Sequence, residues 1–429
     1  MALKFWPLLP RLRPRPSPAE CAAALAYVRQ PELLVEGNRV QLLRRGEQAY
    51  PAMLAAIASA TSHVHLETYI LRSDQTGARF QAALIERARA GVRVRLLFDA
   101  LGSLNLISDE FLAQLVEAGV EIVEFHPITP WRRRWLLRLR GSRERKAELR
   151  GQPAPHHGVE PAHWSINHRD HHKILVVDDR VAFTGGLNIG DEYAPAPEGG
   201  GWHDLHARVE GPAVLGLAQI FRRSWIQGAG ERFEPPRSAA PASDDMRPML
   251  AHTCDNFGLR NRSRMNQAYR HAIRNASTAI SITNAYFIPT RRLGTTLRNA
   301  ARRGVNVRVI VPANSDVKLV GYASRYLYSR LLRAGVRIFE YPERMMHAKA
   351  GVIDGTWATI GSFNLDRRSV IHNLEAGLVV LDRDFAAQLE RQFEADVAIC
   401  REVVLAEWNE RPYTQRFLEW FAHLFAYWL

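Results

Sequence analysis

The chain has 429 residues, with 57 lysines and arginines against 44 aspartates and glutamates, so its formal net charge is +13 at pH 7. This length is about twice that of a usual domain, so we expect two domains or a duplicated fold, and a hydrophobic fraction of 47% is ample for a large core. The basic charge favours a polyanionic partner, either nucleic acid or an anionic membrane, and does not distinguish the two.

Disulfides, secretion and a membrane span are not suggested by the sequence. Cys21, Cys254 and Cys400 are far apart and form no Cys-x-x-Cys pair, which fits a reducing cytosolic setting. The N-terminal MALKFWPLLP is interrupted by Pro7 and Pro10 and is too short for the apolar region of a signal peptide. No stretch has the roughly 20 consecutive apolar residues of a spanning helix. We therefore expect any contact with a membrane to be peripheral.

The same order of predicted elements occurs twice. In the first half they are a helix at 49–62, the alternating strand HVHLETYIL at 63–71, a helix to Gly91, the strand GVRVRLLFDA at 91–100, and a helix and strand at 111–127. In the second half they are a helix at 267–279, ISITNAYFI at 280–288, a helix to Gly304, GVNVRVIVPA at 304–313, and a helix and strand at 328–342. This repetition predicts an α/β fold of two similar units, each around a mainly parallel sheet with added hairpins.

The expected organisation has five parts. They are an N-terminal segment (1–29), a first domain (30–227) with an insertion at 128–170, a linker (228–248), a second domain (249–410) and an amphipathic C-terminal tail (411–429). The linker is placed at GAGERFEPPRSAAPASDD, which contains Gly and Pro and lacks hydrophobic periodicity.

Each half ends in one spaced motif, His-x-Lys-x4-Asp-x6-Gly-x2-Asn. The two copies are HHKILVVDDRVAFTGGLN at 171–188 and HAKAGVIDGTWATIGSFN at 347–364. HHKILVV and HAKAGVI have the pattern of strands, in which side chains two residues apart lie on the same face. We therefore expect the pairs that follow to project together: His171 with Lys173, and His347 with Lys349.

The aspartates and asparagines of the motifs have different expected places. Asp178 and Asp354 lie in the turn sequences DDR and DGT, away from the face of the histidines, so we assign them structural work. The return strands VAFTGG and WATIGS end in small residues, and their glycines allow close approach of the backbone. These strands should present Asn188 and Asn364 near the site.

Two histidine–lysine pairs at equivalent repeat positions predict phosphodiester chemistry. A pseudo-twofold axis would bring the pairs together, so that one neutral imidazole attacks phosphorus while the other, protonated, donates to the leaving alkoxide. The lysines and asparagines would stabilise the charge on the oxygens of the transition state. This chemistry needs no metal or other cofactor. The alternative, that these are only satisfied residues at strand ends, is weakened by their recurrence in both repeats.

The two motifs resemble those of the phospholipase D superfamily, and the likeness covers about residues 30–410. Within it, the chain is most similar to the bacterial cardiolipin synthases that lack N-terminal transmembrane helices. The segments that carry the likeness are HLETYIL (65–71), HHKILVVDDRVAFTGGLNIGDEY (171–193), WHDLHARVEGPAV (202–214) and GSFNLDRRSVIHNLEAGLVV (361–380). The resemblance implies paired α/β/α sandwiches with the site at their interface. It also implies transphosphatidylation, in which phosphatidylglycerol forms a phosphatidyl-histidine, releases glycerol and passes the phosphatidyl group to a second lipid headgroup hydroxyl.

The resemblance further implies roles for single residues. His171 would be the nucleophile and His347 the general acid and then base, although the near symmetry leaves this order open. In the family an acidic residue usually orients each histidine. The candidates are Asp204, in WHDLH, for the first half and Glu375 for the second half.

The remaining candidates are weaker. Glu67 and Asn284 occupy matching places in the two repeats, so they are candidates to line the pocket. The insertion departs from the family pattern, and its histidines raise a zinc alternative: His156, His157, His163 and His168. No cysteine accompanies these histidines and no two have the spacing of a helical metal pair, so we predict no metal site.

Two segments favour a lipid substrate over nucleic acid. WRRRWLLRLR at 131–140 repeats apolar residues at four-residue intervals among arginines. In RFLEWFAHLFAYWL at 416–429, Trp420 and Tyr427 border an apolar helical face. That face comprises Leu418, Phe421, Leu424, Phe425 and Trp428. Aromatic residues of this kind favour the membrane–water interface. The alternative is that each segment packs into the core or onto a partner chain.

We therefore predict a transferase that acts on anionic phospholipids, such as phosphatidylglycerol and cardiolipin, as a peripheral protein of the cell membrane at its cytoplasmic face. Nucleic acid is not the expected partner, because a nuclease should have basic residues interleaved with stacking aromatics along a groove. Hydrolysis by a phospholipase D-type enzyme and a nuclease of the same superfamily are the alternatives. A scaffold with a decayed site is poorly supported because neither motif has lost a residue. The acceptor lipid, phosphatidylglycerol or phosphatidylethanolamine, and the oligomeric state stay open.

Overall fold

The computed structural model describes residues 23–128, 167–195, 201–230, 233, 249–258, 262–342 and 344–428. The basic segment 131–140 and most of the predicted linker 228–248 lie outside these residues, as do three insertion histidines: His156, His157 and His163. Within the described part of the chain, no helix is both long enough and apolar enough to span a membrane.

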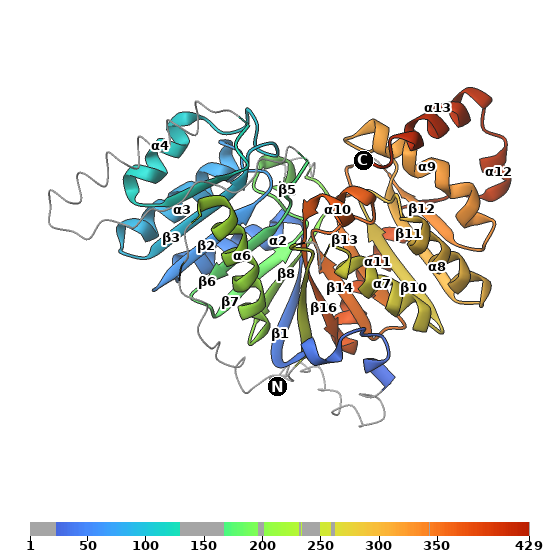
Figure 1. Cartoon of the computed structure of the whole chain (residues 1–429), viewed down its shortest axis with the longest axis horizontal. Coiled ribbons are helices and arrows are strands. Elements are labelled where there is room, and N and C mark those ends of the chain that lie inside the picture. Colours follow the sequence, from blue (N-terminus) through green and yellow to red (C-terminus); the bar gives the residue numbers. More distant parts are fainter. Residues whose placement is uncertain are drawn as a thin grey trace, which may run out of the picture.

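The two halves share one sheet of 15 strands and meet at its centre (Figure 1). There β1 (Val35–Arg44) of the first half pairs antiparallel with β9 (Met249–Asp255) of the second. Outward from β1 come β8 (Leu205–Glu210), β7 (Val181–Gly185), β6 (Lys173–Val177), β2 (His63–Thr68), β3 (Arg93–Asp99) and β4 (Glu121–Phe125). Outward from β9 come β16 (Ala376–Leu381), β14 (Trp357–Gly361), β13 (Lys349–Ile353), β10 (Ala279–Asn284), β11 (Asn306–Pro312), β12 (Arg337–Tyr341) and the edge strand β17 (Arg401–Glu402). The matching order confirms the predicted duplication.

The expectation of a mainly parallel sheet is wrong. Within this 15-stranded sheet, parallel pairing is limited to β2, β3 and β4 in the first half and to β10, β11 and β12 in the second. These strands are joined by the crossover helices α3 (Gln75–Arg89), α4 (Asp109–Ala118), α8 (Arg291–Arg302) and α9 (Lys318–Leu332). The motif strands β6–β7 and β13–β14 are joined by tight turns, and a tight turn allows only antiparallel pairing.

Helices cover both faces of the sheet and tie the halves together. On one face, α2 (Arg45–Ala58), α3 and α4 enclose a core of the first half, and α7 (Arg264–Asn275), α8 and α9 enclose one of the second. On the other face, α6 (Ala213–Ala229) and α11 (Arg383–Val397) share a core that takes strand residues from both halves. Burial of apolar surface across the junction therefore holds the two motif strands in a defined relation.

The first described residues pack on the second half of the molecule, although they precede the first domain in sequence. Val28 lies in the second-half core, and the Tyr27 hydroxyl donates to Asp354 at 2.7 Å. The described end of the predicted N-terminal segment (1–29) thus belongs in space to the second half.

The tail helix α13 (Tyr413–Leu424) lies beside α9 (Figure 1). The side that it packs against α9 consists of small and polar residues. Ala422 and Ala426 are buried against Val320 and Ala323, and buried Glu419 accepts from Arg411 at 2.8 Å. All seven apolar residues predicted for the tail's face and borders are exposed: Leu418, Trp420, Phe421, Leu424, Phe425, Tyr427 and Trp428. The alternative that this face packs into the core is therefore wrong.

Candidate active site

Both histidine–lysine pairs lie at the beginning of a motif strand, at the interface of the two halves. His171 lies two residues before β6 begins at Lys173, and His347 lies two residues before β13 begins at Lys349. Each lysine Nζ donates to the backbone carbonyl of its own histidine. All four side chains are buried. The same contact thus holds each lysine beside its histidine in both repeats.

Backbone bridges between the halves bring the two motifs together. The His171 amide donates to the Leu374 carbonyl at 2.9 Å, next to the two-residue pairing of β5 (Arg169–Asp170) with β15 (Asn373–Leu374). The His347 amide donates to the His203 carbonyl at 2.7 Å, beside an isolated bridge from His203 to the residue before His347. The chain before each histidine is therefore held by the opposite half.

Each histidine is oriented by a carboxylate from the other half, which corrects the expected assignment. Glu375 Oε2 lies 2.9 Å from His171 Nδ1, and Asp204 Oδ2 lies 2.8 Å from His347 Nδ1. The sequence predicts Asp204 beside the first-half histidine and Glu375 beside the second-half one. The exchange follows from the bridges above, because Glu375 directly follows Leu374 and Asp204 directly follows His203.

The two orienting carboxylates have different surroundings. Glu375 accepts from Ser362 Oγ at 2.5 Å and from Ser369 Oγ at 2.7 Å, and burial raises its pKa to about 7. At the position of Ser362 the first repeat has Gly186, where a Cβ would lie 2.1 Å from Asp204 Oδ1. Burial also raises the pKa of Asp204, but the positive charges of His347 and Lys349 outweigh it and hold that pKa below its ordinary value. Asp204 is therefore the more strongly ionised of the two.

Burial also shifts the four cationic groups toward their neutral forms. It lowers the pKa of His171, and the charges of Lys173 and Lys349 lower it further. It lowers the pKa of His347 as well, but there the Asp204 carboxylate opposes the shift. Desolvation brings Lys173 to a pKa of about 7 and Lys349 to about 8. The site is thus a buried cluster whose charge state changes near neutral pH.

Asp178 and Asp354 lie in turns and cap the entry into β2 and β10. Asp178 accepts from the backbone amides of residues 61–63, and Asp354 from those of residues 277–279, at 2.7 to 2.9 Å. Burial acts to raise the pKa of both carboxyls, but the hydrogen bonds from these backbone amides outweigh it and hold both pKa values below the ordinary value. The geometry agrees with the structural work predicted for them.

The motif asparagines differ from each other. Asn188 Oδ1 accepts from the Ile70 amide at 3.1 Å and its Nδ2 donates to the Tyr193 hydroxyl at 2.7 Å, so its side chain holds neighbouring loops. Asn364 is buried, and its Oδ1 has no hydrogen-bond partner. Of the two asparagines predicted to contact substrate, Asn364 is the one with free hydrogen-bonding capacity.

Glu67 and Asn284 do not occupy matching places. Strand pairing sets Thr68 opposite Lys173 and Asn284 opposite Lys349, so the partner of Asn284 is Thr68. A shift of one residue turns a side chain to the other face of a sheet. Asn284 instead accepts from the Leu365 amide at 3.0 Å and steadies the loop after Asn364.

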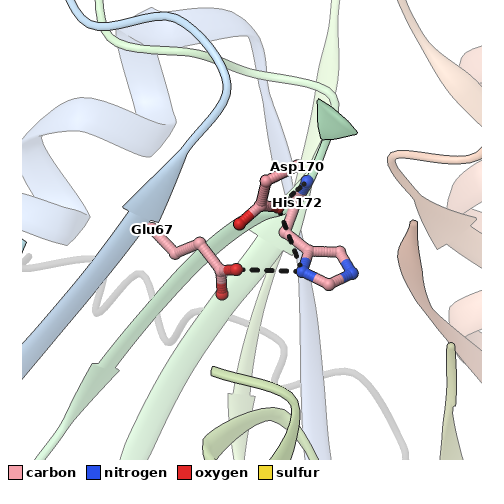
Figure 2. Close-up of side chains that lie close together, drawn as sticks. All are labelled: Glu67, Asp170 and His172. Carbon is pink, nitrogen blue, oxygen red and sulfur yellow. Dashed lines mark hydrogen bonds and ion pairs between the residues drawn. The ribbon is translucent and has the colours of Figure 1, made fainter. Parts of the chain in front are cut away.

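Glu67 belongs to a buried triad beside the site (Figure 2). Its Oε1 lies 3.0 Å from His172 Nδ1, and Asp170 Oδ1 lies 3.2 Å from the same atom. Across the described ranges, these three side chains form the one group of histidines and carboxylates close enough to hold a metal ion. Burial raises the pKa of Glu67 to about 7 and that of Asp170 well above its ordinary value. Protons retained on these two carboxyls would reduce the negative charge of the triad in place of a metal ion. The insertion histidine His168 is not part of this triad; its Nδ1 donates to the His372 carbonyl instead.

Two tyrosines, which sequence reasoning missed, flank the histidines. The ring of Tyr69 lies 4.9 Å from that of His171 and 5.2 Å from Lys173 Nζ, and the ring of Tyr286 lies 6.3 Å from that of His347. Both tyrosines follow the strand that pairs with a motif strand, within two residues of its end. That position was the signal available in the sequence.

Comparison with known proteins identifies the family to which the chain belongs. A family model described as "Cardiolipin synthase, PLD-like domain" matches residues 269–397. A cardiolipin synthase of Geobacillus kaustophilus (strain HTA426) is 32% identical over 98% of this chain and 76% of its own length. Cardiolipin synthase B of Salmonella typhi is 35% identical over 86% of this chain and 83% of its own length. The crystal structure of a phosphatidylserine synthase of Haemophilus influenzae Rd KW20 shares the fold, with a TM-score of 0.67 and 14% identity over 94% of this chain and 98% of that one. The chain belongs to the cardiolipin synthases, a family of phosphatidyltransferases in the phospholipase D superfamily.

Proposed function

We propose that this chain makes cardiolipin by transferring the phosphatidyl group of one phosphatidylglycerol to a free headgroup hydroxyl of a second, with release of glycerol. The observation that carries the proposal is the pair of histidines at one interface, each oriented by a carboxylate of the opposite half. With the carboxylates as acceptors, Nδ1 of each imidazole carries a proton and Nε2 is left to react.

The first half-reaction breaks the bond between phosphorus and the glycerol oxygen. His171 Nε2 attacks phosphorus and forms a phosphatidyl-histidine, while His347 gives its Nε2 proton to the departing glycerol oxygen. In the second half-reaction His347 takes the proton of the incoming lipid hydroxyl, whose oxygen attacks phosphorus and displaces His171. Atoms and protons balance over the cycle, and both histidines return to their starting states.

The unequal carboxylates support this order of roles. Asp204 is ionised, and its charge opposes the effect of burial on His347, so His347 is the histidine that more readily holds the proton an acid must give. His171 faces Glu375, whose pKa is raised to about 7, and two lysines lower the pKa of His171 further. A neutral imidazole is what a nucleophile requires.

The lysines and Asn364 are suited to the charged transition state. Lys173 and Lys349 are buried beside their histidines, where a positive charge acts with little screening. Asn364 is buried at the same interface with its Oδ1 unpartnered, and rotation of the amide by 180° would place its Nδ2 donor at this position. We assign these three side chains to the phosphoryl oxygens.

The exposed tail supports action at a membrane surface. The aromatic side chains of α13 face solvent, and such side chains favour the membrane–water interface. The net charge of +13 adds attraction to anionic phospholipids, the proposed partners and substrates. The free thiols of Cys254 and Cys400 fit the cytoplasmic face of the cell membrane.

Product analysis tests this proposal. The protein is incubated with phosphatidylglycerol alone, and then with phosphatidylethanolamine added. Cardiolipin and glycerol in equal amounts are the expected products with phosphatidylglycerol alone, and any mixed product in the second reaction identifies the acceptor. Phosphatidic acid as the main product would identify a hydrolase, and cleavage of single-stranded DNA without lipid turnover would identify a nuclease.

A further inference from the structure

The outer side of the second half has a cavity of about 360 Å³ between α7 and α8. Five arginines line it: Arg270, Arg274, Arg291, Arg292 and Arg303. Threonine and asparagine side chains of α8 complete the lining. None of these residues belongs to the site described above.

The positive charge of this cavity is not balanced by acidic residues. Helix α7 contains three arginines and α8 four, and neither contains an aspartate or glutamate. Elsewhere in this half arginines are paired, as Arg308 is with Glu390 and Arg325 with Glu340, each at 2.7 Å. Within the described residues, no ion pair involves any of the five lining arginines. Such uncompensated charge is unfavourable unless an anion neutralises it.

The local structure adds to this imbalance. Arg291 and Arg292 are the first two residues of α8, where the helix dipole disfavours positive charge. Burial lowers the pKa of Arg270, and the charges of Arg274 and Arg292 lower it further. Arg270 Nε is also buried without a hydrogen-bond partner. An anion in the cavity would relieve both the repulsion and the unmet hydrogen bond.

We propose that this cavity binds the phosphate of an anionic phospholipid that is not being turned over, and so holds the protein on its membrane. The inference rests on the proposed function and adds a lipid contact outside the catalytic site. Guanidinium groups bind phosphate oxygens in a bidentate manner, which suits a cluster of arginines.

A lipid is the favoured source of the phosphate because the cavity adjoins the exposed tail helix. Ile288, three residues before Arg291, is buried in one apolar cluster with Ala422 of α13 and with Ala426, so the beginning of α8 lies close to the tail helix. The outer side of α13 presents Phe417 and Phe421, which are 59% and 45% exposed. An apolar anchor and the first turn of the helix that lines the phosphate site thus lie on either side of one buried cluster.

Vesicle binding of the full chain tests the inference. The double variant Arg270→Gln/Arg292→Gln removes two cavity charges, and Arg303 is left intact because it donates to three carbonyls at the end of α7. A matched control, Arg302→Gln/Arg333→Gln, removes two exposed charges that do not line the cavity. On vesicles of phosphatidylglycerol and phosphatidylcholine at low salt, the cavity variant should bind about 25-fold more weakly, at about fivefold per arginine. The control should change by less than about threefold.

Cardiolipin synthesis in detergent micelles separates this inference from the proposed function, because recruitment to vesicles does not limit that assay. The cavity variant should keep its micelle activity and its melting temperature. If the Arg270→Gln/Arg292→Gln variant does not fold, the variant Arg274→Gln/Arg291→Gln, which removes two exposed cavity charges, takes its place. Equal losses in the cavity and control variants would overturn the inference, as would unchanged vesicle binding. The inference would also be overturned if the cavity variant lost binding to inorganic phosphate or to a DNA oligonucleotide while its affinity for vesicles stayed the same.

Discussion

Glu375 of the second half lies 2.9 Å from Nδ1 of His171 in the first half, and Asp204 of the first half makes the matching contact with His347 at 2.8 Å. Each of the two catalytic histidines thus takes its orienting carboxylate from the opposite repeat. The catalytic arrangement therefore depends on the packing of the two halves, and a change in one half should be felt by the histidine of the other.

The first prediction tests the carboxylates. Asp204→Asn and Glu375→Gln keep the shape of the side chains but remove the negative charge, and they introduce an NH2 donor that favours the wrong histidine tautomer. Each should lower kcat for cardiolipin formation by about 10²- to 10⁴-fold. Melting temperatures, measured in parallel, should stay near that of the unaltered protein.

A substrate with a good leaving group separates the two roles. Phosphatidyl-p-nitrophenol needs little proton donation, so Asp204→Asn and His347→Ala should still release a burst of nitrophenolate as the covalent adduct forms. His171→Ala should release none. A burst in His171→Ala and none in His347→Ala would reverse the assignment of nucleophile and acid.

The second prediction concerns the lysines. Because burial brings Lys173 to a pKa of about 7 and Lys349 to about 8, both lose their charge as pH rises through this range. The value of kcat/KM should therefore fall from about pH 7 upward. Arginine stays charged over this range, so Lys173→Arg should shift the decline to higher pH even where its rate is lower. A profile that is flat to about pH 10 would contradict the role given to the lysines.

The third prediction concerns the Glu67 triad. The folded-state pKa of Glu67 is about 7, above its unfolded value of 4.5, so its contribution to stability is full below pH 4.5 and is lost as pH rises through 7. Glu67→Gln does not titrate. The free energy of unfolding should therefore fall less for the variant than for the unaltered protein between about pH 5 and about pH 8, by on the order of 2 to 3 kcal/mol. The free energies of unfolding are measured by urea titration at both pH values. An equal fall in the variant and in the unaltered protein would count against a raised pKa of Glu67.

The fourth prediction tests the turn aspartates. The backbone of both residues is in the left-handed conformation, with φ of 53° at Asp178 and 49° at Asp354. Asparagine tolerates this conformation better than alanine does. Their folded-state pKa is below 3.8, so they contribute stability above pH 3.8 that is lost as pH falls through the folded value. At neutral pH, Asp178→Asn should destabilise the protein by about 1 to 3 kcal/mol, and Asp178→Ala by more. Activity well below the melting temperature should be unchanged; a large loss there would give Asp178 a catalytic role.

The repeat made much of the fold and site predictable. A spaced motif that occurs twice implies equivalent strands, and the period of a strand places His171 beside Lys173 without further information. The alternation of helices and strands indicates the crossovers around β2, β3 and β4, although it overstated how far parallel pairing extends. What the sequence could not show is which half supplies the partner of each histidine. That depends on short bridges, such as His203 beside Met346, which leave no pattern in the sequence.

The mismatch of Glu67 and Asn284 has a different cause. Aligning the first residues of HVHLETYIL and ISITNAYFI places His63 with Ile280. The observed register places Val64 with Ile280, which also matches apolar with apolar residues. Alternating patterns match almost as well after a shift of one residue, and only the buried face decides between the two registers.

The last prediction concerns the exposed face of α13. A truncation is a poor test, because it would expose the residues of α9 that pack against Ala422 and would remove Glu419, the buried partner of Arg411. Replacing Phe417 and Phe421 with serine removes two exposed rings and leaves these contacts in place.

Phe417→Ser/Phe421→Ser should weaken binding to vesicles by roughly 30-fold, at about 1 kcal/mol for each ring that enters the interface. The matched control is Ile399→Ser/Val404→Ser, which removes two apolar side chains that are 55% and 48% exposed outside the tail helix. Because apolar insertion is not screened by salt, the loss should persist at high salt and on vesicles of neutral lipid, where the arginine cavity contributes little. Equal affinity of the variant and the unaltered protein under those conditions would show that α13 is not the anchor. A melting temperature several degrees lower would instead show that the rings stabilise the fold.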